Sequence, residues 1–276
     1  MYRKNVLKSR LQAGENVYGA WVGSGSPANA EVLGHVGFDF LVVDLEHGAG
    51  ELSDAVAMLR AAEASGTPCI VRAPWNDPIW LKRALDAGVD SVMIPSVETA
   101  EAARAAVAAC RYPPQGTRGY AAGVVRASTF GLEPGYVAKA NDNLLVVLQI
   151  ESKATLDHAA ELCAVDGVDV VFIGVNDLAG SIGRLEQLDH PDVRSLVARA
   201  EEIILASGKP MGTVPSAGAS WQELFRRGYR MVVGPHDVIL LREAALAARR
   251  EYESFAAGGA PSSDATGGSS SSARSY

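Results

Sequence analysis

The sequence is poor in cysteine, and it has no long apolar run. Its three cysteines among 276 residues, Cys69, Cys110 and Cys163, are widely spaced and lie in apolar segments. This pattern argues against a disulfide framework or a zinc knuckle and indicates reduced packing residues. No run approaches the roughly 18 apolar residues of a membrane-spanning helix, and the first residues lack the apolar stretch and cleavage site of a signal peptide. We therefore expect a cytoplasmic protein with no membrane partner.

Basic residues are also scarce relative to acidic ones. The chain has 25 Lys and Arg against 32 Asp and Glu, for a formal net charge of -7. Phosphate backbones require a basic face, so we expect no nucleic-acid partner. With 48% hydrophobic and 21% charged residues, the chain has an ordinary globular composition, and its length fits one α/β barrel of about 250 residues.

Short, apolar, β-rich segments recur eight times along the chain. They are Val17–Gly23, Phe38–Asp44, Pro68–Arg72, Ser91–Val97, Leu144–Glu151, Val168–Gly174, Pro210–Val214 and Arg230–Gly234. Helical patterns occupy the gaps, at 51–66, 79–87, 98–110, 155–163, 192–207, 221–227 and 238–252. Continuous apolar strands that alternate with helices are typical of a parallel sheet covered by helices. Eight such units predict a closed (β/α)8 TIM barrel rather than an open sheet.

Two segments depart from this alternation. Residues 112–141 form an insertion that is too long for a usual connection, so we expect a functional or interface role there. From Ala256 onward the composition is dominated by Ala, Gly and Ser, which is typical of a disordered tail. The predicted organisation is a single barrel domain over residues 1–255 and a tail over 256–276.

Ionisable residues gather at the carboxyl ends of four of the expected strands. Active sites of (β/α)8 barrels lie at this end, so we expect these side chains to share one mouth. The set consists of Asp44, Glu46 and His47 at the end of the second strand, Arg72 at the end of the third, Glu151 at the end of the fifth and Asp177 after the sixth.

Glu151 and Asp177 are the strongest candidate metal ligands. Two carboxylates from adjacent strands suit Mg2+ or Mn2+ and leave coordination positions for water and substrate oxygens. Co2+, Zn2+ or Ni2+ remain alternatives. Taken singly, each carboxylate would serve equally well as a helix cap or salt-bridge partner, and it is the pairing that favours a metal.

The other groups at this mouth suit enolate chemistry. A metal polarises a bound carbonyl, and Arg72 can lie against the developing negative charge. His47 is the candidate base, directly or through a metal-bound water, with Asp44 orienting its ring. Glu46 either hydrogen-bonds a metal-bound water or supports the loop. The structural alternatives are a hydrogen-bonded histidine and an arginine that only bridges carboxylates.

Substrate binding is expected from the loop after the sixth strand and from neighbouring side chains. Backbone N–H groups between Gly174 and Leu178 lead towards a helix start and can hold a substrate carboxylate. Trp21 is a further candidate, with a core or interface position as its alternative, and Trp75 can shape the mouth. The substrate-binding candidates are Arg72, Trp21, Gly174, Asn176 and Asp177.

Five blocks of the sequence occur together over about residues 5–253. They are FDFLVVDLEHGAG, VRAPWNDPIWLKRALDAGVDSVMIPSVETA, RYPPQGTRGYAAGVVRAS, LQIES and VDVVFIGVNDLAGSIG. In identity and order they resemble the HpcH/HpaI aldolase family, the metal-dependent class II pyruvate aldolases. The resemblance implies a phosphoenolpyruvate/pyruvate-type barrel. It also implies reversible cleavage of 4-hydroxy-2-oxo acids to an aldehyde and pyruvate, or a related 2-oxo acid such as hydroxypyruvate, through a metal-stabilised enolate.

The same resemblance implies roles for individual residues. Glu151 and Asp177 bind Mg2+, Mn2+ or Co2+, Arg72 touches the substrate carbonyl oxygen, and His47, paired with Asp44, transfers the proton. Asp86 is a further catalytic candidate, because it matches a residue that in relatives reaches into the site of a neighbouring subunit. The resemblance further implies a homo-oligomer, commonly a hexamer, with the last helix exchanged between subunits. For Asp86 a plain surface position is the alternative.

Two departures from the family pattern leave the identity of the aldehyde undetermined. GVNDL stands where relatives often have Gly-Pro-x-Asp-Leu, which alters the backbone around Val175, and Pro235 and His236 stand where smaller residues are expected. The alternative function is an acyl-CoA or citrate-type lyase or synthase of the same barrel family, with Arg118 and Arg126 as the candidate CoA contacts. A non-enzymatic sensor of a 2-oxo acid is disfavoured, because binding alone does not require a base.

Overall fold

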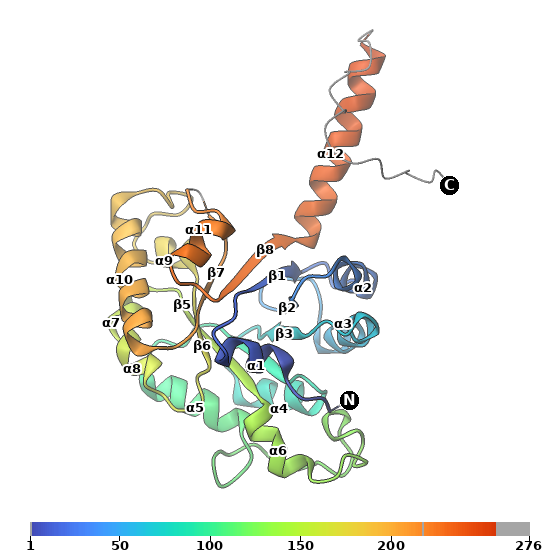
Figure 1. Cartoon of the computed structure of the whole chain (residues 1–276), viewed down its shortest axis with the longest axis vertical. Coiled ribbons are helices and arrows are strands. Elements are labelled where there is room, and N and C mark those ends of the chain that lie inside the picture. Colours follow the sequence, from blue (N-terminus) through green and yellow to red (C-terminus); the bar gives the residue numbers. More distant parts are fainter. Residues whose placement is uncertain (1, 217, 258–276) are drawn as a thin grey trace. The chain divides into compact units, whose positions relative to one another are not determined.

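Eight parallel strands form a closed barrel in the computed structural model, which describes residues 2–216 and 218–257 (Figure 1). The strands are β1 (Val17–Val22), β2 (Phe40–Asp44), β3 (Cys69–Arg72), β4 (Ser91–Ile94), β5 (Leu145–Ile150), β6 (Val170–Ile173), β7 (Met211–Thr213) and β8 (Met231–His236). Each strand pairs with the next along the chain, and β8 closes the barrel against β1. The prediction of a (β/α)8 barrel is confirmed, with β8 running two residues past its expected end.

Helices connect successive strands, as the alternation predicted. They are α2 (Pro27–Val36), α3 (Leu52–Ser65), α4 (Pro78–Asp86), α5 (Ala100–Cys110), α7 (Lys153–Asp157), α8 (Ala159–Cys163), α9 (Val175–Gly180), α10 (Pro191–Ser207) and α11 (Trp221–Arg226). The helix expected over 155–163 is divided at His158 into α7 and α8. The sequence patterns did not predict α2 or α9. Ser26 caps α2 and Gly37 ends it in the left-handed region, but its Ala-rich interior gives little amphipathic signal.

The apolar core has an outer and an inner layer. Leu41 and Val43 of β2 point outward to the layer packed against the helices, whereas Phe40 and Val42 point into the barrel. This alternation follows from the two-residue period of a strand. The short helix α1 (Val6–Gln12), also not predicted, contributes buried Leu7 and Leu11 to the inner layer. The amino end of the barrel is therefore closed by packed side chains.

The insertion over 112–141 is ordered. It contains a 3-10 turn (Arg126–Ser128) and leads into α6 (Tyr136–Asn143). The side-chain amide of Asn141 joins its two ends by accepting from the Tyr112 N–H at 2.8 Å and donating to the Tyr112 carbonyl at 3.0 Å. Arg126 pairs with Glu63 of α3 at 2.7 Å. Side-chain bonds of this kind stabilise a loop that lacks strand partners.

The chain divides into two compact units, residues 1–237 and 238–276. The first contains the barrel, and the second contains nearly all of α12 (Asp237–Ala256). The single domain predicted over 1–255 stays a prediction, and the predicted disordered tail lies, from residue 258, outside the described residues. Among the helices that the structure describes, none is both long and apolar enough to cross a membrane.

All three cysteines are buried and unpaired, as expected of packing residues. Burial raises the pKa of the Cys69 and Cys110 thiols to about 12. Thiols of this kind stay protonated at neutral pH and are poor nucleophiles.

Candidate active site

The predicted ionisable residues lie at the carboxyl ends of β2, β3, β5 and β6. Strand register places Asp44 beside Arg72, and Ile150 beside Ile173, the residues just before Glu151 and Gly174. Parallel register therefore delivers the side chains to one end of the barrel, as the sequence predicted.

Arg72 is held rigidly by two carboxylates and an aromatic ring. Its Nε and Nη2 donate to Asp44 Oδ1 and Oδ2 at 2.8 and 2.7 Å, and its Nη1 lies 2.9 Å from Glu46 Oε2. Trp21 lies beneath the guanidinium, with 4.5 Å from Cζ to the ring centroid. Burial opposes ionisation of Asp44, but the bonds and charge of Arg72 bring its pKa below the ordinary value. The result is a fixed positive charge at the mouth.

The predicted role of Asp44 as the orienter of the His47 ring is not what the geometry shows. Both Asp44 oxygens face Arg72, and His47 reaches Asp44 only through its backbone N–H, at 3.4 Å. The His47 side chain is 64% exposed, and its Nε2 lies 3.9 Å from Glu46 Oε2. Two carboxylate oxygens that hold a bidentate arginine have little capacity left for a ring N–H. Among the residues that the structure describes, Glu46 is the carboxylate paired with the imidazole.

Glu46 has a more central position than the sequence indicated. Its side chain is 16% exposed and lies between Arg72 and His47. Burial is the main cause that raises the pKa of Glu46 to about 7, with Arg72 opposing it and Glu151, Asp44 and Asp177 adding to it. The carboxylates of Asp44, Glu151 and Asp177 are therefore close enough to Glu46 to disfavour its ionisation.

Glu151 is oriented by two residues that sequence analysis missed. Its Oε1 accepts from the backbone N–H of Ser96, and its Oε2 accepts from the side-chain amide of Gln149. Ser96 has a φ of 56°, a conformation that favours glycine and costs about 1–3 kcal/mol in another residue. Gln149 is 2% exposed and, two residues after Val147 of the inner layer, points into the barrel. The polar Gln149 within an otherwise apolar strand could have indicated its role from the sequence, whereas no sequence feature indicated a role for Ser96.

Gly174 allows β6 to approach Glu151 closely. A Cβ at Gly174 would lie 3.1 Å from the Glu151 Cβ, so a larger residue here would require Glu151 to shift by a few tenths of an ångström. The Gly174 N–H itself donates to the Ile150 carbonyl at 2.9 Å, and the Leu178 N–H donates to the Gly174 carbonyl. Of the backbone N–H groups expected to hold a substrate, those of Val175, Asn176 and Asp177 therefore remain, because they lie in the first turn of α9 and have no acceptor within the helix.

Asn176 and Asp177 are exposed on this first turn, directly after β6. Within residues 2–216 and 218–257, no group of three or more His, Cys, Asp or Glu has the arrangement of a metal site. Glu151 and Asp177 are a pair rather than such a group, and their role as metal ligands stays a prediction. Each Glu151 oxygen accepts one hydrogen bond and keeps a lone pair for coordination. Hard oxygen donors in this number suit a hydrated cation that keeps positions open.

Asp86 does not join the mouth in this chain. It ends α4, the helix that leads away from the mouth after β3, and its Oδ1 accepts from Arg118 Nη2 at 2.7 Å. Arg118 is 5% exposed and stacks on Tyr112 at 4.3 Å from the ring centroid. Asp86 therefore fastens the insertion to α4.

His236 and Asp237 organise the loop after β1. A Cβ at Gly23 would lie 2.6 Å from His236 Nε2. Asp237, which is 5% exposed, accepts from the Gly23 N–H at 3.1 Å, from the Ser24 hydroxyl and from the Asn29 amide at 3.0 Å. The Gly23 carbonyl accepts from the Ala49 N–H at 3.1 Å, in the loop that follows His47. His236 packs against Gly23 and lies 3.1 Å from Asp237, and Asp237 holds the loop after β1.

Replacing Asp237 with Asn should lower the free energy of unfolding by about 2–4 kcal/mol at pH 7, because the bonds to one oxygen lose their charge and the new amide N–H2 faces groups that donate. Burial opposes its ionisation, but bonds from His236, Ser24 and Asn29 outweigh it and lower the pKa of Asp237. A lowered folded-state pKa stabilises the fold above the unfolded value and ceases to do so as pH falls through the folded value.

Urea unfolding of the parent and Asp237→Asn chains should therefore give a difference that is constant from pH 7 to about 5 and shrinks as the pH falls below about 4, the ordinary pKa of an aspartate. The exposed Asp142→Asn is the matched control and should change little at any pH. A difference for Asp237→Asn that did not shrink below pH 4 would contradict a role for its charge.

A (β/α)8 barrel with two carboxylates, a clamped arginine and a histidine at its carboxyl end is the arrangement expected of an enzyme that uses a metal ion as a Lewis acid on a small substrate. A sequence profile of the HpcH/HpaI aldolase/citrate lyase family matches residues 17–244. The chain belongs to this family, which confirms the resemblance read from the five blocks.

Named relatives agree with this assignment. The chain is 42% identical to 2-dehydro-3,6-dideoxy-6-sulfogluconate aldolase of Pseudomonas putida, over 82% of this chain and 89% of that one. It is 37% identical to hydroxypyruvate/pyruvate aldolase of Delftia acidovorans, over 90% and 92%. A crystal structure of a family protein from Burkholderia cenocepacia has 38% identity and a TM-score of 0.85, over 90% of this chain and 99% of that chain. The expected enzyme class, an aldolase and hence a carbon–carbon lyase, is confirmed.

Proposed function

We propose that this chain reversibly cleaves a 4-hydroxy-2-oxo acid into an aldehyde and pyruvate or hydroxypyruvate. The single observation that carries the proposal is the mouth itself, where Asp44 and Glu46 fix Arg72 and where Glu151 and Asp177 follow the neighbouring strands β5 and β6. The names of the two aldolase relatives support the choice of a 2-oxo acid as the shared product.

Glu151 and Asp177 are proposed to hold a divalent cation, with Mg2+, Mn2+ and Co2+ preferred over Zn2+ and Ni2+. When bound, the cation acts as a Lewis acid on the carbonyl of a 2-oxo acid. Ser96 and Gln149 fix the Glu151 carboxylate before the cation arrives, so little reorganisation is needed. The exposed first turn of α9, with Asn176, is proposed to bind the substrate carboxylate.

Arg72 is proposed to stabilise the enolate oxygen. Asp44 and Glu46 hold its guanidinium, and Trp21 supports it from below, so the charge is oriented before substrate binds. His47 is proposed to move the proton because its ring is exposed at the mouth. Glu46, 3.9 Å from the His47 ring and with a pKa raised to about 7, is suited to accept or return that proton.

The acyl-CoA or citrate-type alternative loses its main support. The candidate CoA contacts, Arg118 and Arg126, are both paired with carboxylates inside the fold, at 2.7 Å in each case. Their charges bind the insertion to α4 and α3, so they do not form an open basic cluster for a CoA phosphate.

A homo-oligomer is proposed as the working form, with a hexamer as the expected size and the last helix exchanged between subunits. Seven large apolar side chains of α12 are exposed by 43% or more, including Leu241 at 67% and Phe255 at 73%. A helix of this kind is stable when another surface covers it. We also propose that Asp86 contributes to the site of a neighbouring subunit. The protein is proposed to be cytoplasmic.

The proposal is tested by pyruvate proton exchange. In heavy water with Mg2+, Mn2+ or Co2+, the enzyme should exchange the methyl protons of pyruvate, observed as loss of the methyl signal in NMR. It should also release pyruvate from 4-hydroxy-2-oxo acids. Exchange tests the shared half-reaction without knowledge of the aldehyde. Absence of both reactions with every metal and aldehyde tried would reject the proposal.

A further inference from the structure

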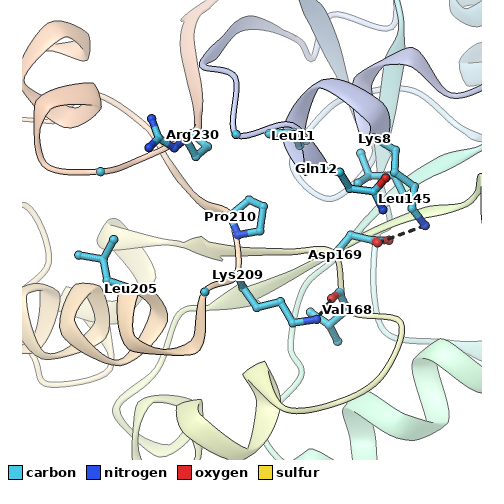
Figure 2. Close-up of a pocket in the computed structure, with 13 residues that line it drawn as sticks. Lys8, Leu11, Gln12, Leu145, Val168, Asp169, Leu205, Lys209, Pro210 and Arg230 are labelled. Carbon is cyan, nitrogen blue, oxygen red and sulfur yellow. Dashed lines mark hydrogen bonds and ion pairs between the residues drawn. The ribbon is translucent and has the colours of Figure 1, made fainter.

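A shift in the register of β8 turns His236 into the mouth. The strand follows Arg230, which lines a cavity of about 500 Å3 at the amino end of the barrel (Figure 2), and it ends at His236. Gly19 of β1 pairs with Val233 of β8. Trp21 is two residues further along β1, yet its partner His236 is three residues further along β8. The extra residue in β8 places His236 on the same face as Trp21, which points into the barrel.

The His236 imidazole occupies the space that Gly23 leaves by having no side chain. A Cβ at Gly23 would lie 2.6 Å from His236 Nε2 and 2.7 Å from its Cε1. The same Cβ would lie 3.9 Å from the Cα of Gly48, the residue directly after His47. The ring is therefore beside the loop that carries the candidate base, and its side chain is 28% exposed.

Asp237 fixes the orientation of this ring. His236 Nδ1 lies 3.1 Å from Asp237 Oδ1. Burial opposes the ionisation of Asp237, but bonds from His236 and other neighbours lower its pKa, so it is a carboxylate at neutral pH. A carboxylate only accepts hydrogen bonds, which assigns the N–H to Nδ1 and places Nε2 at the edge of the ring that meets Gly23. The Gly23 N–H donates to the same carboxylate at 3.1 Å, so the ring and the loop after β1 have one anchor.

The cleavage step brings the aldehyde fragment to this side of the mouth, if the proposed function holds. The 4-hydroxyl loses its proton as the bond between C3 and C4 breaks, and C4 becomes the aldehyde carbon. A base must be within hydrogen-bond reach of the proton that it removes, so C4 lies beside His47. The carbons beyond C4 are then near Gly48 and Gly23, on the side where His236 lies.

We propose that His236 determines aldehyde specificity by binding a hydroxyl group of the aldehyde fragment through Nε2. This inference rests on the proposed function and adds the class of aldehyde, a short hydroxyaldehyde. A hydroxyl donates to Nε2 of a neutral imidazole and accepts from Nε2–H of a protonated one, so it suits the ring in both states. An apolar aldehyde of the same length forgoes this bond, and the enzyme selects against it.

Aldol addition of pyruvate to three aldehydes of equal carbon number tests this proposal. They are 2-hydroxypropanal, 3-hydroxypropanal and propanal, each used with the Mg2+-loaded full chain, and kcat/KM for the aldehyde is measured. The variants are His236→Ala, Gly23→Ala and the double variant. Gly23 is not among the residues with positive φ, so an alanine is compatible with its backbone and acts by displacing the ring. His35→Ala, at an exposed histidine of α2, is the matched control.

The parent should prefer at least one hydroxyaldehyde over propanal by about five- to tenfold, the value of one hydrogen bond. His236→Ala and Gly23→Ala should each remove most of this preference, and the double variant should lose no more than either, because both changes act on one ring. His35→Ala should keep it. Pyruvate proton exchange, which needs no aldehyde, should fall much less than kcat/KM for the hydroxyaldehyde. Circular dichroism shows that each variant is folded.

The failure of this inference is distinguishable from the failure of the proposed function. A parent that exchanges pyruvate protons but treats the three aldehydes alike would overturn the inference alone. The same holds if both single variants retain the preference, or if they lower exchange and all three additions equally, as a purely structural role requires. A parent without exchange and without addition would reject the proposed function, and the inference with it.

Discussion

Removal of divalent metal should abolish both pyruvate proton exchange and aldol cleavage, and Mg2+, Mn2+ or Co2+ should restore them. Glu151→Gln and Asp177→Asn should each weaken cation binding and lower both rates by more than about a hundredfold, because several kcal/mol of charge stabilisation depends on the cation. Mn2+ binding measured by electron paramagnetic resonance gives the affinity independently of activity.

The control for this prediction is Glu98→Gln. Glu98 is an exposed carboxylate four residues past the end of β4, so its loss changes the net charge equally without removing a proposed ligand. It should leave Mn2+ affinity and both rates close to those of the parent. Full activity in excess chelator would instead indicate a Schiff-base mechanism with a lysine nucleophile.

The barrel could be predicted because its strands are covered on both sides. Burial on both faces makes each strand a continuous apolar run, such as LVVLQI at Leu145–Ile150, and the intervening helices carry periodic apolar positions. Helices without that periodicity escaped prediction. The seven residues of α1 are too few to show a clear period, and α9 begins directly at the mouth, where Asn176 and Asp177 read as loop residues.

The ionisable residues that end β2, β3, β5 and β6 could be predicted to lie at one mouth, but their pairing could not be predicted. Residues at the ends of parallel strands must meet, which placed Asp44 and Arg72 together. Which partner Asp44 takes depends on the direction of its side chain, and sequence spacing does not define that direction. The left-handed conformation of Ser96 was likewise beyond reach, because serine has no particular preference for it.

Arg72→Ala and His47→Ala should lower pyruvate proton exchange and aldol cleavage together. Both reactions pass through one enolate, so the loss of its electrostatic stabiliser should cost about a hundred- to a thousandfold. Loss of the proton-transfer group should cost about a hundred- to ten-thousandfold. NMR exchange rates and pyruvate release are compared on the same preparations, and Mn2+ affinity should survive in both variants.

The pair Arg72→Lys and Asp44→Asn sharpens this prediction, because the structure assigns Asp44 to the arginine and not to the imidazole. A lysine cannot make the two parallel bonds to Asp44, so Arg72→Lys should recover only part of the lost rate. If Asp44 acts through Arg72, Asp44→Asn should slow the enzyme much less in an Arg72→Ala background than in the parent. Equal losses in both backgrounds would return Asp44 to the role of an independent partner of His47.

If His47→Ala exchanged pyruvate protons at the parent rate, Glu46 would become the leading candidate for the base, and Glu46→Gln would then abolish exchange.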